Sequence, residues 1–189
     1  MEERKYLTEE EFARFLGAVR AEKDARECAR NVAIFTVMYW RGLRASEIGK
    51  LQLTSWRQKA GSLYVVRAKG SLSGEYLLSP PEARALKAWA RERGAQPGPL
   101  FPSRNGTGIG RAMLHVLMRK YGERAGLPRD LRHCHVLKHS IGTHLIGKLD
   151  VKAVQDWLGH KDIKSTMVYT QFRSKDRDAA SRRIYDEAA

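Results

Sequence analysis

The segment 25–41 constrains the fold more than any other part of the chain, because it predicts a helix that is largely buried. Its second half carries closely spaced apolar residues: Val32, Ile34, Phe35, Val37 and Met38. Gly42 follows and breaks the helix. A helix that is apolar around most of its circumference has to be covered by other elements. The rest of the chain is therefore expected to supply the layers around residues 25–41.

Most of those other elements are predicted to be helical. Thr8 with Glu11 forms a capping box, which begins a helix near 8–21, and Asp150 is suited to begin another. Residues 63–66 are β-formers and residues 75–78 form a returning strand, with turns between them at 69–70 and 73–74. Further helices are expected at 45–51, 82–93, 111–125, 136–148, 151–158 and 163–171, with a loop at 94–110. The fold class is mainly α with one small antiparallel sheet (α+β).

Charge narrows the range of partners. The 189 residues contain 35 Lys and Arg against 21 Asp and Glu, a net charge of +14, which favours a polyanion such as nucleic acid. No apolar run has the length of a membrane span, and no basic amphipathic helix has a clear insertion face, so a membrane partner is not expected. The polar, acidic start of the chain does not resemble a secretory signal, and Cys28 and Cys134 alone fit a reducing cytoplasm.

Two motifs place cations where a phosphate can be bound. In G-L-R-A-S-E-I, Arg44 lies between a helix break and a new helix, and its planar guanidinium matches two phosphate oxygens. In R-A-K-G-S-L-S-G, Lys69 lies at the expected hairpin tip, from which it can enter a DNA groove or reach a leaving oxygen. Taken singly, each also fits an ordinary solvated surface residue.

Two later motifs carry titratable side chains. In H-C-H-V-L-K-H-S, His135 and His139 have the spacing of two zinc ligands, but the glutamate of H-E-x-x-H is absent and no acidic third ligand lies nearby. In L-G-H-K-D-I-K-S-T-M-V-Y-T, His160 lies in a turn after Gly159, and Tyr169 follows one short helix later. A tyrosine can act as a nucleophile through a covalent intermediate, although an isolated tyrosine is usually structural.

The ordered set of motifs, from about residue 6 to about residue 172, resembles the tyrosine recombinases, or phage-type integrases. The resemblance implies the catalytic-domain fold of that family and strand exchange through a phosphotyrosine, with no metal and no cofactor. It assigns the nucleophile to Tyr169 and the non-bridging phosphate oxygens to Arg44 and Lys138. His160 is expected to add a hydrogen bond, His135 to assist proton transfer and Lys69 to protonate the departing 5′ oxygen.

Two features depart from the family pattern. Lys138 stands where H-x-x-R has its second arginine, so the charge is kept and the bidentate fork is lost. The chain also begins where the catalytic domain of most members begins, after their separate N-terminal DNA-clamping domain, which fits either a trimmed chain or a short member similar to the fimbrial-switch recombinases. The alternatives to a recombinase are a type IB topoisomerase-like nicking–closing enzyme and a DNA-binding accessory protein with weakened catalysis.

The expected organisation is a catalytic domain at 1–172 and a charged tail at 173–189, in which Ile184 and Tyr185 are apolar anchors. The expected partner is double-stranded DNA. A charged segment with so few apolar anchors either stays disordered or docks on another surface. The family resemblance implies that it docks on a neighbouring protomer, so that a chain that is monomeric in free solution assembles as a tetramer on DNA. The expected location is the cytoplasm, in association with the nucleoid.

Overall fold

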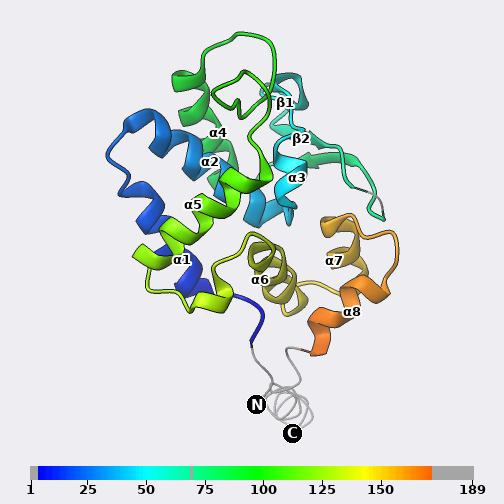
Figure 1. Cartoon of the computed structure of the whole chain (residues 1–189). Helices are drawn as coiled ribbons and strands as arrows, with labels where there is room; N and C mark the ends of the chain where they lie inside the picture. The colour runs from blue at the N-terminus through cyan, green and yellow to red at the C-terminus, as the bar shows by residue number, and fades with distance from the viewer. Residues whose placement is uncertain (1–3, 69, 172–189) are drawn as a thin grey trace, which may run out of the picture.

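The structure, a computed structural model, describes residues 4–68 and 70–171 (Figure 1). Lys69 and the expected docking tail lie outside the described residues. These residues form eight α-helices and one three-stranded sheet, which lies at one side of the helices. The helices are α1 (Glu9–Arg20), α2 (Ala25–Arg41), α3 (Ala45–Ile48), α4 (Pro80–Arg93), α5 (Arg111–Arg124), α6 (His135–Ile146), α7 (Val151–Leu158) and α8 (Lys164–Gln171). The strands are β1 (Trp56–Arg57), β2 (Ser62–Val65) and β3 (Gly74–Leu77), and two short 3-10 turns cover Leu53–Ser55 and Arg129–Leu131. The fold class predicted from the sequence is confirmed.

Helix α2 is the centre of the packing, as its apolar pattern predicted. It contacts α1, α4, α6 and α3, and Ile34, Phe35 and Met38 are fully buried. Gly42 ends the helix with φ of 56°, a left-handed conformation that suits glycine. A Cβ atom at Gly42 would also lie 2.5 Å from Cδ2 of Leu158 on α7. This glycine therefore turns the chain toward α3 and leaves room for α7 to pack closely.

The capping box predicted at the start of α1 is confirmed. The backbone N–H of Glu11 donates to the Thr8 hydroxyl (3.1 Å), and the backbone N–H of Thr8 donates to the Glu11 carboxylate (2.8 Å). These bonds satisfy two N–H groups that a helix start leaves without partners. The apolar face of α1 then packs on α2, with Phe15 and Val19 fully buried.

The sheet is antiparallel in the order β1–β2–β3, and its register pairs Leu63 with Tyr76 and Val65 with Gly74. Leu63 and Val65 point into the core, while Leu77 is exposed. The returning strand, predicted at 75–78, begins one residue earlier, at Gly74. Strand β1 was not predicted separately, because two residues are too few to give a periodic signal.

Helix α4 begins at Pro80, two residues before the predicted start. Proline at the first helical position costs no hydrogen bond, because the N–H there has no helical partner. The early start places Glu82 in the first turn, where its buried carboxylate pairs with the buried guanidinium of Arg41 (2.8 Å). This ion pair joins α4 to the end of α2, close to Gly42.

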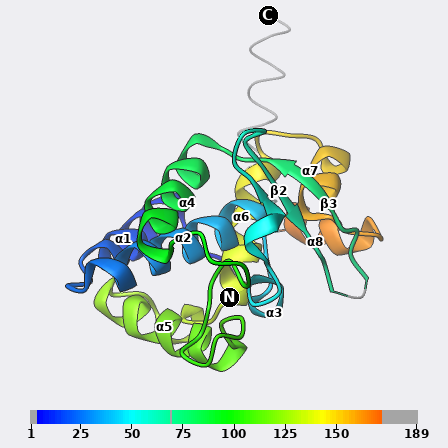
Figure 2. The same cartoon turned by 90° about the horizontal axis from the view of Figure 1, so that it is seen from above.

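Helices α6, α7 and α8 pack against one another at the lower side of the molecule in Figure 1. Asp150 caps α7 as predicted, since its side chain accepts from the backbone N–H of Ala153 (2.8 Å). Gly159 ends α7 in the left-handed conformation, with φ of 63°. The loop between β2 and β3 extends toward this end of α7 (Figures 1 and 2), where the N–H of Leu72 donates to the carbonyl of Gly159 (2.7 Å). Among the described residues, no helix is long and apolar enough to cross a membrane.

Candidate active site

Arg44 is held at the start of α3 by the glutamate that follows it in the same motif. Its backbone N–H donates to Glu47 (2.8 Å), and its Nη1 donates both to Glu47 (3.1 Å) and to the hydroxyl of Ser71 in the hairpin loop (3.2 Å). The Arg44 side chain keeps 34% of its surface exposed, whereas that of Glu47 is buried at 1%. The guanidinium is therefore fixed on one side and open on the other, as an anion-binding arginine requires.

The Glu47 carboxylate also fixes the base of the hairpin loop between β2 and β3. Glu47 accepts from the backbone N–H of Ala68 (2.9 Å) and lies 3.8 Å from Nη1 of Arg67. Burial raises the pKa of Glu47, but hydrogen bonds from the Ala68 and Arg44 backbones and the charge of Arg67 lower it below its usual range overall. The Glu47 carboxylate is consequently ionised, and it ties Arg44 to the loop that precedes Lys69.

Arg67 is a second cation of this cluster, and its side chain is fully buried. Its guanidinium donates to the carbonyls of Arg41 (2.9 Å) and Gly42 (3.3 Å). These carbonyls have no helical partner because α2 ends there. It also donates to the carbonyl of Trp157 near the end of α7 (3.5 Å). Arg67 therefore joins the hairpin to two helix C-termini, whose partial negative charge favours a cation.

Lys138 lies in the first turns of α6, and its ammonium nitrogen is buried with no hydrogen-bond partner among the described residues. Burial, and then the neighbouring charges of Arg67 and Arg44, lower the pKa of Lys138 to about 7 against the opposing charge of Glu47. A buried polar group without a partner is uncommon in a folded protein. Binding an anion at this position would supply the missing partner and favour the charged amine.

His135 and His139 lie one helical turn apart at the start of α6. Their rings are perpendicular, with centroids 4.5 Å apart, and His135 is exposed whereas His139 is half-buried. Partial burial of each imidazole and the adjacent charges lower the pKa of His135, and lower that of His139 to about 4. In the part of the chain that the structure describes, no group of three or more His, Cys, Asp or Glu side chains is arranged to hold a metal ion.

His160 lies in the turn between α7 and α8, as predicted, with its Nδ1 2.9 Å from the hydroxyl of Thr166. Burial, then the charges of Lys138 and Arg67, lower the pKa of His160 to about 3, so the imidazole is neutral near pH 7. A neutral imidazole has one N–H to donate. The backbone beside it is also fixed, since residues 71 and 160 form an isolated antiparallel bridge.

Tyr169 is the buried centre of this arrangement, with only 2% of its surface exposed. Its ring stacks on His160 (centroids 6.3 Å apart, 19° between the planes) and meets His139 edge-on (5.8 Å, 67°). It also packs on the bare backbone of Gly142, where a Cβ atom would lie 2.6 Å from the ring. Burial raises the pKa of Tyr169 to about 12 against the opposing charge of Arg44, so the phenol is protonated and needs a base before it can attack.

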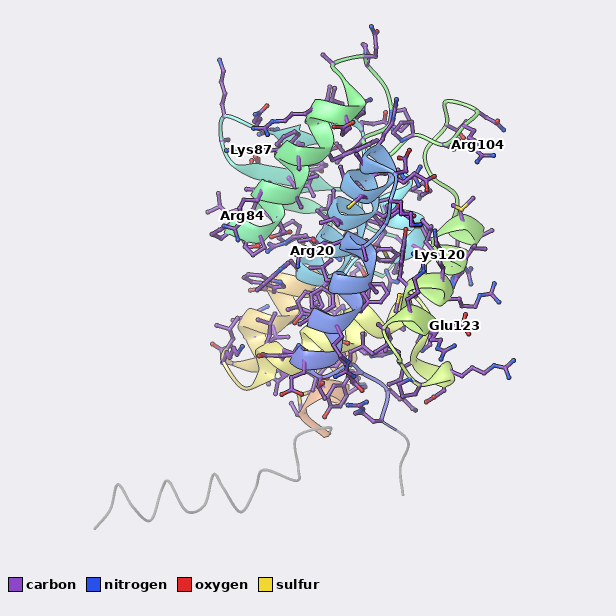
Figure 3. All side chains as sticks on the ribbon, turned by 90° about the vertical axis from the view of Figure 1, so that its left-hand side faces the viewer. Arg20, Arg84, Lys87, Arg104, Lys120 and Glu123 are labelled. Carbon is purple, nitrogen blue, oxygen red and sulfur yellow. The ribbon has the colours of Figure 1, made fainter. Side chains whose placement is uncertain are left out.

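An open pocket of about 330 Å³ lies beside these groups and has a basic lining. The lining residues are Arg44, Ala45, Ser46, Arg111, His115, Cys134 and His135. Cationic side chains are also found elsewhere: Figure 3 shows Arg84 and Lys87 on α4 and Lys120 on α5, on the side of the molecule opposite the hairpin tip. What sets the pocket apart is therefore that Arg44 and His135, which line it, also neighbour Lys138, the less exposed histidines and the buried tyrosine.

Comparisons with known proteins show the family to which the chain belongs. Residues 5–175 match the model of the Phage integrase family. The type 1 fimbriae regulatory protein FimB of Escherichia coli (strain K12) is 33% identical over 172 residues, which cover 88% of this chain and 84% of FimB. The chain belongs to the phage integrase family. Tyrosine recombinase XerC of Xylella fastidiosa (strain M23) is 36% identical over 170 residues, which cover 84% of this chain and 55% of XerC. The chain thus spans about half the length of the XerC relatives.

Solved structures place the chain in the same fold. The XerH site-specific recombinase bound to difH substrate superposes with a TM-score of 0.77 at 27% identity, over 93% of this chain and 52% of XerH. The XerA recombinase superposes with a TM-score of 0.79 at 22% identity, over 100% of this chain and 64% of XerA, a likeness of fold. These likenesses confirm the catalytic-domain fold that the motif order implied.

The structure brings together five of the six residues that the motifs singled out in this phage integrase. These are Arg44, His135, Lys138, His160 and Tyr169. Lys69 itself is outside the described residues, but the loop on either side of it contacts the site through Ala68 and Ser71.

Sequence reasoning missed Glu47, Arg67 and Gly142. Glu47 had a signal, because it lies three residues after Arg44 at a capping position of α3. Arg67 had none, because a basic residue next to a hairpin tip looks like a solvated one.

Proposed function

We propose that this phage integrase breaks and rejoins double-stranded DNA as a site-specific recombinase, through a covalent 3′-phosphotyrosine at Tyr169. The observation that carries the proposal is the gathering of Arg44, Lys138 and His160 around a buried tyrosine beside an open basic pocket. Attack on a phosphodiester builds negative charge on the phosphoryl oxygens, and cations fixed in advance stabilise that charge. The proposal applies to the catalytic domain at 1–172.

The family resemblance assigns each of these groups a role, and the geometry of the groups supports the assignment. The half-exposed guanidinium of Arg44 and the unpartnered amine of Lys138 bind the non-bridging oxygens, and the neutral His160 donates a hydrogen bond to one of them. The Tyr169 oxygen forms a bond to phosphorus as the bond to the 5′ oxygen breaks. Lys69 gives that departing oxygen its proton, and His135 assists proton transfer from its exposed position on α6. Because the phosphotyrosine conserves the bond energy, rejoining is the reverse of these steps and requires no cofactor.

The proposed partner is duplex DNA, and the net charge of +14 supports it. The XerH relative was solved bound to its difH substrate. We propose further that the chain is a monomer in free solution, forms a cyclic tetramer on two DNA sites through the tail at 173–189, and is located with the nucleoid in the cytoplasm. Removing the tail should then weaken assembly and recombination more than DNA binding, and equal recombination without the tail would reject this assembly.

Incubation with nicked suicide duplexes that carry the attachment region tests the chemistry. The wild-type chain should form a DNA adduct that survives SDS, and peptide mass analysis should find it on Tyr169. Tyr169→Phe removes only the hydroxyl and should abolish the adduct while DNA binding persists. Tyr64→Phe, on the exposed face of β2, is the matched control and should keep the adduct. An adduct on another residue would reject the assignment.

A further inference from the structure

His139 has no role in the function proposed so far, yet its imidazole is placed as a functional group would be. Its Nδ1 is buried and has no hydrogen-bond partner among the described residues. Leaving such a nitrogen without a partner is unfavourable, so an unsatisfied buried group in a folded protein calls for an explanation. A purely structural residue at this position would gain stability from an apolar ring of the same shape.

The ring of His139 lies between the buried nucleophile and the surface. On one side it meets the ring of Tyr169 at 5.8 Å, and on the other it meets the ring of His135 at 4.5 Å. His135 is exposed and lines the open pocket. The three side chains therefore form a continuous row from Tyr169 to solvent, and each of them can exchange a proton.

Tyr169 needs such a route for its hydroxyl proton. Burial holds the pKa of Tyr169 at about 12, so its proton must be removed as the oxygen attacks. Arg44 remains permanently charged and cannot accept a proton. His160, on the other face of the tyrosine ring, has its Nδ1 engaged with Thr166. Of the two imidazoles that pack against the Tyr169 ring, His139 is the one whose Nδ1 has no partner among the described residues.

The surroundings of His139 keep its imidazole in the neutral form, which can accept a proton. Burial lowers its pKa to about 4, which leaves the imidazole neutral near pH 7. The charged and titratable groups that act on it are His135 and Lys138 on its own helix, His133 before that helix, Lys5 from the N-terminal segment and Tyr169 on α8. None of these is a carboxylate, so an anionic phosphate in the site would be the group that favours a protonated His139.

We propose that His139 is the general base for Tyr169 and the middle of a proton relay that ends at His135. As the Tyr169 oxygen bonds to phosphorus, its proton moves to Nδ1 of His139. The opposite nitrogen of His139 releases a proton to His135, which passes it to solvent. The P–O bond to the 5′ oxygen breaks, and that oxygen takes a different proton, from Lys69. This relay rests on the proposed cleavage chemistry and adds to it the path of the tyrosine proton.

Single-turnover cleavage of a suicide duplex tests the relay in His139→Asn and His139→Phe. The first variant keeps a polar atom near the position of Nδ1 and the second keeps the ring, but neither accepts a proton at neutral pH. Each should cleave about a hundredfold more slowly at pH 7, the usual contribution of general base catalysis. The defect should shrink as pH rises and hydroxide replaces the base. A duplex with sulfur as the 5′ leaving atom should show the same defect, because that leaving group needs no proton.

A second measurement separates proton transfer from packing. Replacement of Tyr169 by a fluorinated tyrosine lowers the pKa of the phenol and removes the need for a base. The fluorinated His139→Phe chain should then cleave within a few-fold of the fluorinated wild-type chain. A loss that the fluorinated residue does not restore, or cleavage by the variants at the wild-type rate, would overturn the relay alone. Absence of any adduct in the wild-type chain would overturn the proposed function and the relay together.

Discussion

Lys138→Met should make the protein more stable while it removes cleavage. Lys138 has 2% of its surface exposed, and its ammonium has no hydrogen-bond partner among the described residues. Burial and two neighbouring arginines lower its pKa from 10.5 to about 7. At about 1.4 kcal/mol for each pH unit, holding the amine charged costs about 5 kcal/mol. Methionine has a similar length and no charge, so it fills the space without that cost.

The pKa of Lys138 also determines in which direction, and over which pH range, the stability of the wild-type chain changes. The folded chain holds the Lys138 proton only below about pH 7, while the unfolded chain holds it up to about 10.5. Wild-type stability therefore rises between these values, because the unfolded state binds more protons there. The advantage of Lys138→Met should be about 4 to 5 kcal/mol at pH 6.5 and only about 1 kcal/mol at pH 10.

Urea unfolding of both chains at pH 6.5 and pH 10 measures the difference. Lys87→Met is the matched control, since Lys87 is exposed on α4 (Figure 3), and it should change stability by less than about 0.5 kcal/mol at either pH. If Lys138→Met is no more stable than wild type at pH 6.5, or if its gain in stability does not shrink as pH rises to 10, Lys138 is not a buried cation that destabilises the fold.

Other predictions concern cleavage and binding. Lys138→Arg should keep or raise the rate of cleavage. It should also remove the loss of cleavage rate that deprotonation of Lys138 causes above about pH 7. Lys138→Ala should lower the cleavage rate by about a hundredfold or more. Equal rates for wild type and Lys138→Ala would place the phosphate elsewhere. Gly142→Ala puts a methyl group within 2.6 Å of the Tyr169 ring, so it should displace the tyrosine and reduce cleavage at least tenfold, with DNA binding retained in a mobility-shift assay. Affinity for duplex DNA should fall steeply with salt, because bound phosphates release counterions; a flat titration would contradict a DNA-binding role for the charge.

The sequence predicted most of the fold because the helix signals were local. The capping box at Thr8, the cap at Asp150 and the break at Gly42 each depend on a few neighbouring residues, and all three are present in the structure. The start of α4 was predicted two residues late, because Pro80 was interpreted as the end of the sheet rather than as the first residue of a helix. Strand β1 gave no signal, since its pairing with β2 alone defines it.

The candidate site was only partly predictable, because motifs are local whereas the burial of their side chains depends on long-range contacts. Motif order identified Arg44, His160 and Tyr169 as residues that belong together, and the structure places them in one cluster. Burial could not be inferred from the motifs. The isolation of the Lys138 ammonium and the enclosure of Arg67 both depend on contacts between segments far apart in the chain. These contacts set the pKa values, so the electrostatics of the site required the structure.

The hydrogen bond between the Leu72 N–H and the Gly159 carbonyl has a consequence for the nascent protein. The ribosome completes the segments that hold Arg44 and the hairpin long before it makes the turn at His160, and it adds Tyr169 later still. The hairpin loop is therefore complete before its partner at the end of α7 exists, so the contact that fixes residues 71 and 72 beside His160 forms late in synthesis.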